Sequence, residues 1–157
     1  MKILRIVLIF FALQAPAMIS QAETRPAQIE TAAGPVRIVA DGEARILLLR
    51  NSVLYRGTDF MRVNRYVRLK SCDVILIRDF VGPVACPVRF LALGLRRGGG
   101  WHLSAPFGDC ADDPDIEVDR DNVTIHFRAF GPLPASTWRF DGRQLFKRKE
   151  PAPPKPG

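Results

Sequence analysis

The chain has 157 residues and a formal net charge of +7, and one domain of this length can bury a core without help from metals or disulfides. Residues 23–142 sum to only about +1, because the excess of Lys and Arg lies at the two ends of the chain. Nucleic-acid binding is therefore disfavoured, since it needs a basic patch on the folded domain itself.

The first 22 residues (1–22) have the build of a secretory signal peptide. Lys2 and Arg5 give a positive start, an unbroken apolar run covers Ile6–Leu13, and a small-residue cleavage site ends at Ala22. A membrane anchor is the alternative, but the apolar run is shorter than the ~20 residues of a spanning helix. We expect a cleaved signal, a periplasmic or extracellular location, and no transmembrane segment after cleavage.

Short strands dominate the rest of the chain. Residues 23–34 are polar without a sustained period and predict a loose N-terminal leader. The runs that follow are rich in β-branched and aromatic residues and are separated by turn residues. The candidate strands are Val36–Ala40, Ala44–Leu49, Val53–Tyr55, Tyr66–Lys70, Val74–Ile77, Val88–Leu93, Trp101–Leu103, Ile116–Val118, Val123–Phe127, Trp138–Phe140 and Gln144–Phe146. This spacing predicts an all-β domain over residues 35–147, an antiparallel barrel or sandwich of meander strands and hairpins.

Two features refine this expectation. Asp41-Gly42 and Asp141-Gly142 lie between apolar runs and predict tight hairpin turns, because Gly accepts positive φ without strain. The runs Ile46–Leu49 and Val74–Ile77 are continuously apolar, which predicts strands that are covered on both faces.

Three cysteines leave one unpaired in an oxidising compartment. Cys86 and Cys110 have turn-like surroundings and bracket an out-and-back excursion of the chain, whereas Cys72 adjoins an apolar run. We therefore predict a Cys86–Cys110 disulfide that serves as a structural staple, with Cys72 as a buried free thiol.

The segment between these cysteines contains the binding candidates. Arg96 and Arg97 precede a Gly triplet, and Trp101 and His102 follow it. A phosphate loop needs a helix N-terminus behind it, and the residues after the triplet do not look helical. A flexible hairpin loop is the simpler interpretation, with Trp101 in the core, although an exposed Trp101 would suit a sugar or a protein partner.

Carboxylates recur at every second residue from Asp113 to Asp121, with Asp109 and Asp112 before them. This spacing invites a calcium site, but no Gly lies at the sixth position of an EF-hand loop. We expect a solvated acidic face that protects an edge strand from aggregation. The alternative is an enzyme that uses Asp113 and Asp115 as acid and base.

The two histidines do not point to a catalytic or metal site. His102 and His126 lack zinc-type spacing with Cys, and no G-x-S-x-G elbow is present. Both are expected to be polar residues that face solvent. We therefore expect no metal and no cofactor.

Residues 148–157 contain four prolines and no hydrophobic period. They predict a disordered basic tail that contacts anionic envelope polymers electrostatically at most.

Two short segments resemble a Cys-Pro and Phe-Gly-x-Cys pattern in uncharacterised small secreted bacterial proteins. The residues concerned are Cys86, Pro87, Phe90, Phe107, Gly108 and Cys110. The resemblance implies a bacterial envelope location and a β-rich body, and it brings no known activity with it.

Together these observations favour an exported envelope protein that is a non-catalytic binding or inhibitor-like module. Its expected partner is an envelope protein or polymer. The competing hypothesis is a small hydrolase-type enzyme that draws on the carboxylates of residues 109–121.

Overall fold

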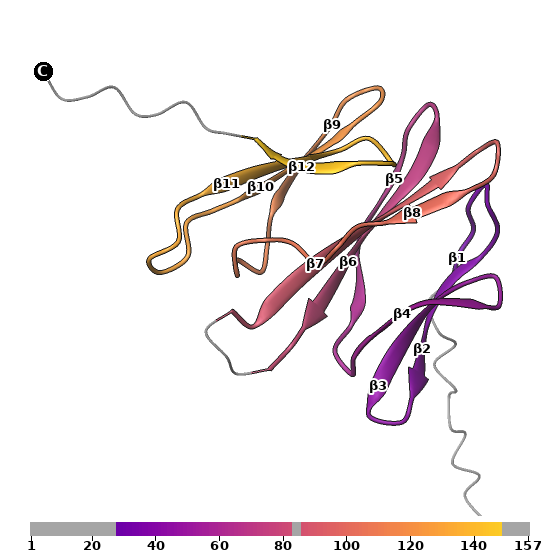
Figure 1. Cartoon of the computed structure of the whole chain (residues 1–157), viewed down its shortest axis with the longest axis horizontal. Helices are drawn as coiled ribbons and strands as arrows, with labels where there is room; N and C mark the ends of the chain where they lie inside the picture. Colours follow the sequence, from indigo (N-terminus) through magenta and orange to yellow (C-terminus); the bar gives the residue numbers. More distant parts are fainter. Residues whose placement is uncertain (1–27, 83–85, 149–157) are drawn as a thin grey trace, which may run out of the picture.

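A computed structural model describes residues 28–82 and 86–148 of the chain (Figure 1). The predicted signal peptide and residues 149–157 of the predicted tail lie outside this part. The described part contains strands and no helix, so it holds no helix that is long and apolar enough to cross a membrane. The strands are β1 (Gln28–Ile29), β2 (Val36–Asp41), β3 (Ala44–Leu49), β4 (Ser52–Thr58), β5 (Arg62–Arg68), β6 (Cys72–Phe80), β7 (Val88–Arg96), β8 (Trp101–Leu103), β9 (Asp115–Val118), β10 (Val123–Phe127), β11 (Ser136–Phe140) and β12 (Leu145–Arg148).

These strands form three antiparallel sheets of four strands, each a meander of consecutive strands. We call them the N-terminal sheet (β1–β4), the central sheet (β5–β8) and the C-terminal sheet (β9–β12). The central sheet lies between the other two (Figure 1), and its residues contribute to both apolar cores of the molecule. The predicted all-β class is confirmed, and of the two architectures the layered sandwich is the one observed, since no sheet formed by the described residues closes on itself.

The central strands explain this layering. Along β6, Val74 and Leu76 pack toward the C-terminal sheet, while Ile75 and Ile77 pack toward the N-terminal sheet. Successive side chains of a strand point to opposite faces, so a stretch covered by two layers is apolar at successive positions, as Val74–Ile77 is. The prediction that Val74–Ile77 is covered on both faces is confirmed.

The same prediction is met only in part for Ile46–Leu49, where Leu47, Leu48 and Leu49 are buried and Ile46 is half-buried. Leu47 and Leu49 of β3 join the core, but the N-terminal sheet is an outer layer, so no sheet of described residues covers the other face. Leu48 and the half-buried Ile46 lie on that face. An apolar run alone cannot distinguish a central strand from an outer strand with apolar residues on its open face.

Both Asp-Gly turns are observed. Gly42 (φ +63°) joins β2 to β3, and Gly142 (φ +86°) joins β11 to β12. The second turn also brings two sheets into close contact, because a Cβ placed on Gly94 of β7 would lie 2.2 Å from the Gly142 carbonyl oxygen. Glycine is therefore needed at position 94 for the C-terminal sheet to dock.

Part of the expected loose leader is ordered. Gln28 and Ile29 pair with Arg37 and Val36, and the Ala32 N–H donates to the buried Asp73 carboxylate at 2.9 Å. A two-residue strand is too short to show a period of two. Asp73, the partner of Ala32, is distant in sequence, so the local sequence pattern contained no signal for this order.

The Cys86–Cys110 disulfide is confirmed, with the two Cα atoms 4.6 Å apart. It connects the start of β7 to the segment before β9, and Cys72 is a buried free cysteine.

Candidate functional site

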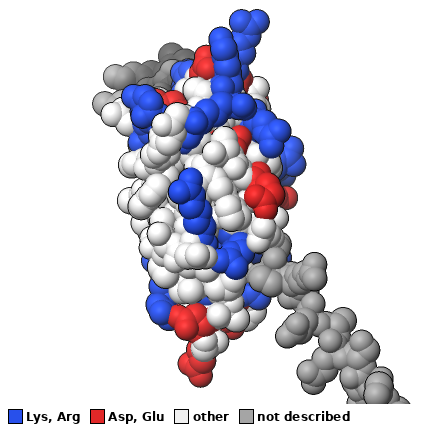
Figure 2. Space-filling model, turned by 90° about the vertical axis from the view of Figure 1, so that its right-hand side faces the viewer, with Lys and Arg blue, Asp and Glu red and all other residues white. Residues whose placement is uncertain are grey.

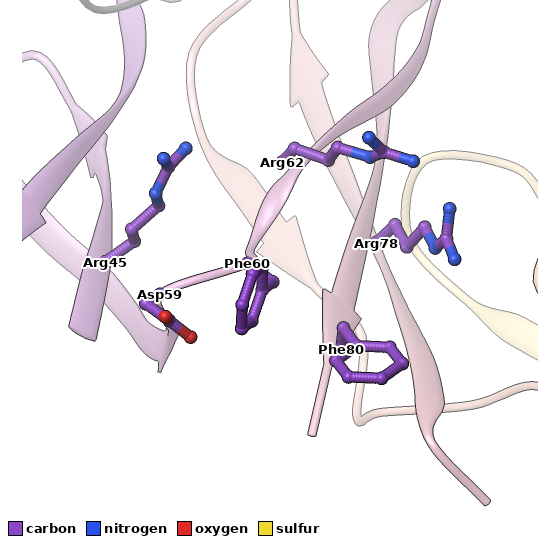
Figure 3. Close-up of a pocket in the computed structure, with 6 residues that line it drawn as sticks. All are labelled: Arg45, Asp59, Phe60, Arg62, Arg78 and Phe80. Carbon is purple, nitrogen blue, oxygen red and sulfur yellow. The ribbon is translucent and has the colours of Figure 1, made fainter. Parts of the chain in front are cut away.

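One candidate site is a cavity of about 560 Å³ beside the start of β5 (Figure 3). Its volume falls in the range of about 300–1,000 Å³ that is typical of small-molecule sites. We call it the arginine cavity. Its lining residues come from β3, the β4–β5 loop, β5 and β6, and they are Arg45, Asp59, Phe60, Arg62, Arg78 and Phe80.

Two of its arginines lie directly opposite each other on neighbouring strands of the central sheet. Arg62 of β5 is the register partner of Arg78 of β6, and the two side chains lie next to each other in Figure 3. Like charges at directly opposed positions destabilise a strand pair. The arrangement therefore costs stability unless an anion is shared between the two side chains.

One partner within the protein offsets part of this cost, and it pairs with Arg78 alone. Arg78 is only 17% exposed, and its Nη2 lies 3.3 Å from the exposed Asp112 carboxylate. Its buried Nε has no hydrogen-bond partner in the described part of the chain. Arg62 forms no ion pair with any described residue.

Arg45 and Asp59 complete the polar lining. Arg45 reaches in from β3, where its Nη1 donates to the Met61 carbonyl at 3.4 Å. Asp59 is the one carboxylate among the six lining residues, so their formal charge sums to +2. The cavity is therefore electropositive but contains one acceptor for a hydroxyl or amine.

Two phenylalanines form the apolar wall. Phe60 and Phe80 meet edge to face, with ring centroids 5.8 Å apart and planes at 83°. Phe60 is 62% exposed, which leaves much of its side chain available for contact. An aromatic or aliphatic group of a ligand would be stabilised there by burial and by edge-to-face geometry.

A buried carboxylate holds the loop that carries Asp59 and Phe60. Asp79 is fully buried, and its Oδ1 accepts the Thr58 N–H at 3.0 Å, with the Thr58 hydroxyl 2.8 Å away. Its Oδ2 accepts the Tyr55 hydroxyl at 3.1 Å, and the Arg89 guanidinium lies 3.6 Å away. Burial raises the pKa of Tyr55, and the nearby Asp79 charge raises it further. These contacts connect the N-terminal sheet to the central sheet beside the cavity.

The binding candidates from the sequence separate into two groups. Arg97 and Trp101 line a second cavity of about 400 Å³, together with Arg50 and Ser52. Trp101 is 51% exposed, so its expected place in the core is wrong. The reason is that β8 has three residues and forms the edge of the central sheet, where the N-terminal sheet does not cover this side chain fully.

The other two candidates, Arg96 and His102, do not line the cavity that contains Arg97 and Trp101. Arg96 lines a different cavity, beside Ser71 and Cys72. His102 is exposed, and its ring lies 6.3 Å from the Phe140 ring on the side of the C-terminal sheet. His126, which was expected to face solvent, is half-buried and its Nδ1 lies 3.1 Å from the Thr137 hydroxyl.

The acidic stretch lies at an edge, as its alternating carboxylates predict. Strand β9 is the outermost strand of its sheet, where the exposed Asp115 forms an ion pair with Arg128 and the exposed Glu117 carboxylate lies 3.5 Å from His126 Nε2. No group of three or more potential metal ligands occurs among the described residues. Asp113 and Asp115 do line a cavity of about 230 Å³, beside Asn64 and Arg65.

Charge is segregated along the fold. Residues 28–82 and 86–108 carry twelve Lys or Arg residues against six Asp or Glu, and two of those six, Asp73 and Asp79, are buried. Figure 2 faces the outer side of the N-terminal sheet, on which basic side chains cover more surface than acidic ones. The net charge of residues 23–142, about +1, does not reveal this division, because many of the acidic residues lie in the stretch 109–121.

Sequence reasoning missed the arginine cavity. One signal was present: Arg78 and Asp79 interrupt an apolar strand between Ile77 and Phe80. Charged residues within a core strand need partners, so they mark a position where polar contacts or a ligand are required.

Comparisons with known proteins add no further identification, since no family model, curated protein or solved structure matches the chain. The resemblance seen around Cys86 and Cys110 thus gains no support from them.

Proposed function

We propose that this protein is a non-catalytic binding module of the cell envelope, and that its arginine cavity takes a small anionic ligand with an apolar group. A carboxylate, phosphate or sulfate would lie between Arg62 and Arg78, and the apolar group would pack on Phe60 and Phe80. The Asp59 carboxylate would accept a hydroxyl or amine of the same ligand.

The observation that carries this proposal is the direct cross-strand pairing of Arg62 with Arg78. Arginine presents a planar fork of donors that suits carboxylate and phosphate oxygens. A bridging anion would convert a repulsive pair into two charge-assisted contacts. Such contacts contribute roughly 1.5–3 kcal/mol each.

The envelope location is supported by the disulfide. Disulfides persist in oxidising compartments and are rare in reducing ones, and Cys86–Cys110 is formed here. Mass spectrometry of the exported protein tests this part of the proposal: we expect an N-terminus near Glu23. A chain that retains Met1 in the membrane fraction would contradict it.

The competing enzyme hypothesis has weaker support. Asp113 and Asp115 share a cavity, but both are exposed, and Asp115 is paired with Arg128 at 3.3 Å. Two carboxylates act as acid and base when their environments differ strongly. Hydrolysis of a test ester or glycoside that is lost in Asp113→Asn would favour the enzyme over the binding module.

The binding experiment is calorimetric titration with phenyl phosphate, which combines an anion with an aromatic ring. We expect phenyl phosphate to bind more tightly than either inorganic phosphate or benzyl alcohol. Arg62→Ala should weaken the affinity by about tenfold to a hundredfold, given the energy of a charge-assisted contact.

The matched control is Arg56→Ala, which removes an equal charge from an exposed residue outside the cavity, where it pairs with Asp41. It should leave the affinity within about twofold, because exposed pairs contribute little. Equal weakening by both variants, or no binding at millimolar phenyl phosphate, would contradict the proposal.

A further inference from the structure

We infer that the second cavity, lined by Arg50, Arg97 and Trp101, binds an acidic sugar unit of a polysaccharide. We call it the tryptophan cavity. It is a separate site from the arginine cavity and shares no lining residue with it. Its walls come from the β1–β2, β3–β4 and β7–β8 turns and the strand ends beside them, and they also include Ala32, Ala33, Leu49, Ser52, Gly99 and Gly100.

The exposed indole is the platform. Trp101 is 51% exposed although it is the largest apolar side chain of its strand. The face of an aromatic ring carries partial negative charge, and the C–H groups on one face of a pyranose ring carry partial positive charge. A sugar ring would therefore stack on Trp101 and cover apolar surface that the protein itself leaves in contact with water.

Arg50 and Arg97 would make the cavity prefer an acidic sugar to a neutral one, because backbone contacts hold both side chains in place. Arg50 Nε donates to the Ala33 carbonyl at 2.9 Å, and Arg97 Nη2 donates to the Leu69 carbonyl at 3.2 Å. Among the described residues neither guanidinium is paired with a carboxylate. Each side chain is thus held by one donor and keeps other donors for an anion.

The backbone conformation around Arg50 fixes the position of its side chain in the cavity. Arg50 has φ +56°, which few residues other than Gly adopt, and its N–H donates to the Pro35 carbonyl at 2.7 Å. Its side chain lies over Gly34, where an added Cβ would be 2.8 Å from Arg50 Nε. Any larger residue at position 34 would displace the guanidinium from the cavity.

The rim favours a polymer over a small enclosed ligand. Gly99 and Gly100 have φ +91° and +85°, and a Cβ at either would meet nothing within 4 Å. The turn beside Trp101 therefore carries no side chain at these two positions that would block a polymer chain leaving the cavity. Ser52 adds a hydroxyl for the sugar's own hydroxyl groups.

Calorimetric titration with trigalacturonate tests this inference, with neutral maltotriose and with AMP as comparison probes. We expect trigalacturonate to bind and maltotriose to bind at least tenfold more weakly. Trp101→Ala and Arg97→Ala should each lower the trigalacturonate affinity about tenfold or more. Arg96→Ala is the matched control, because Arg96 adjoins Arg97 in sequence but lines another cavity, and it should change the affinity by less than twofold.

Tryptophan fluorescence of the wild type gives a second measurement of binding. The chain has two tryptophans, so trigalacturonate should change the emission of the wild type and leave that of Trp101→Ala unchanged. Equal losses in Arg96→Ala and Arg97→Ala would show general charge attraction and overturn the site. Binding of AMP in preference to trigalacturonate, or no binding of trigalacturonate, would overturn it as well.

Discussion

Asp79 and Thr58 connect two sheets of this protein through a single carboxylate oxygen. The Thr58 N–H donates to Asp79 Oδ1 at 3.0 Å, and the Thr58 hydroxyl lies 2.8 Å from the same atom. The hydroxyl also lies 2.7 Å from the Phe80 carbonyl oxygen. Because Thr58 precedes Asp59 and Phe60, the contact that joins the sheets also orients one side of the arginine cavity.

The first prediction concerns this contact. Asp79→Ala leaves the Thr58 N–H and the Tyr55 hydroxyl without their acceptor in a buried position, so we expect a loss of about 3 kcal/mol in the free energy of unfolding. Urea unfolding measures it. Asp41→Ala removes an exposed carboxylate that pairs with Arg56, and it should cost at most about 1 kcal/mol. Equal losses in the two variants would contradict a special role for Asp79.

The second prediction concerns alkaline stability. Burial and the Asp79 charge raise the pKa of Tyr55 above its ordinary value of 10.0, so the folded state holds this proton more tightly than the unfolded state. The contribution of protonated Tyr55 to the stability of the folded state is complete below pH 10.0, and it is lost as the pH rises through the higher folded-state pKa. Tyr55→Phe should therefore lose less stability than the wild type between pH 9 and 11. Parallel pH profiles of the two proteins would refute the linkage.

The third prediction concerns the cysteines. The Cys86–Cys110 disulfide closes a loop in the unfolded chain and so lowers the entropy of the unfolded state. Reduction removes this restriction, and the reduced protein should be less stable by roughly 3–4 kcal/mol. Cys72 is buried, and burial raises the pKa of its thiol. A thiol reagent should therefore label one cysteine in the unfolded oxidised protein and none in the native protein. Rapid labelling of the native protein would show that Cys72 is accessible.

The fourth prediction concerns the docking of the C-terminal sheet. In Gly94→Ala the new Cβ would lie 2.2 Å from a backbone oxygen of Gly142, and backbone cannot yield as a flexible side chain does. We expect a loss of at least about 2 kcal/mol, as for overpacking of a close contact. Gly98→Ala is the control, since its Cβ would meet nothing within 4 Å. A neutral Gly94→Ala would show that the two sheets separate easily.

Local patterns predicted most of the strands. The runs Val123–Phe127 and Ala44–Leu49 match β10 and β3, because alternation and Asp-Gly turns are encoded within a few residues. The Cys86–Cys110 pairing also followed from local surroundings. Both kinds of signal depend on neighbours in sequence, which the chain itself displays.

The arginine cavity could not be predicted in this way. Arg45, Arg62 and Arg78 come from three strands, and their meeting depends on the strand register and on the packing of two sheets. The exposure of Trp101 depends likewise on which strand ends a sheet. A sequence pattern indicates that a strand exists, whereas the neighbours of its side chains are set by tertiary structure.

We propose that the opposed Arg62 and Arg78 bind an anion, at a cost to the stability of the free protein. Thermal unfolding of Arg62→Gln, with and without phenyl phosphate, tests it most directly. Removing one of two directly opposed charges should stabilise the free protein by about 0.2–1 kcal/mol. The same change should greatly reduce the stabilisation that phenyl phosphate gives the wild type by mass action. An Arg62→Gln protein that is less stable when free, yet is stabilised by phenyl phosphate as much as the wild type, would contradict the account.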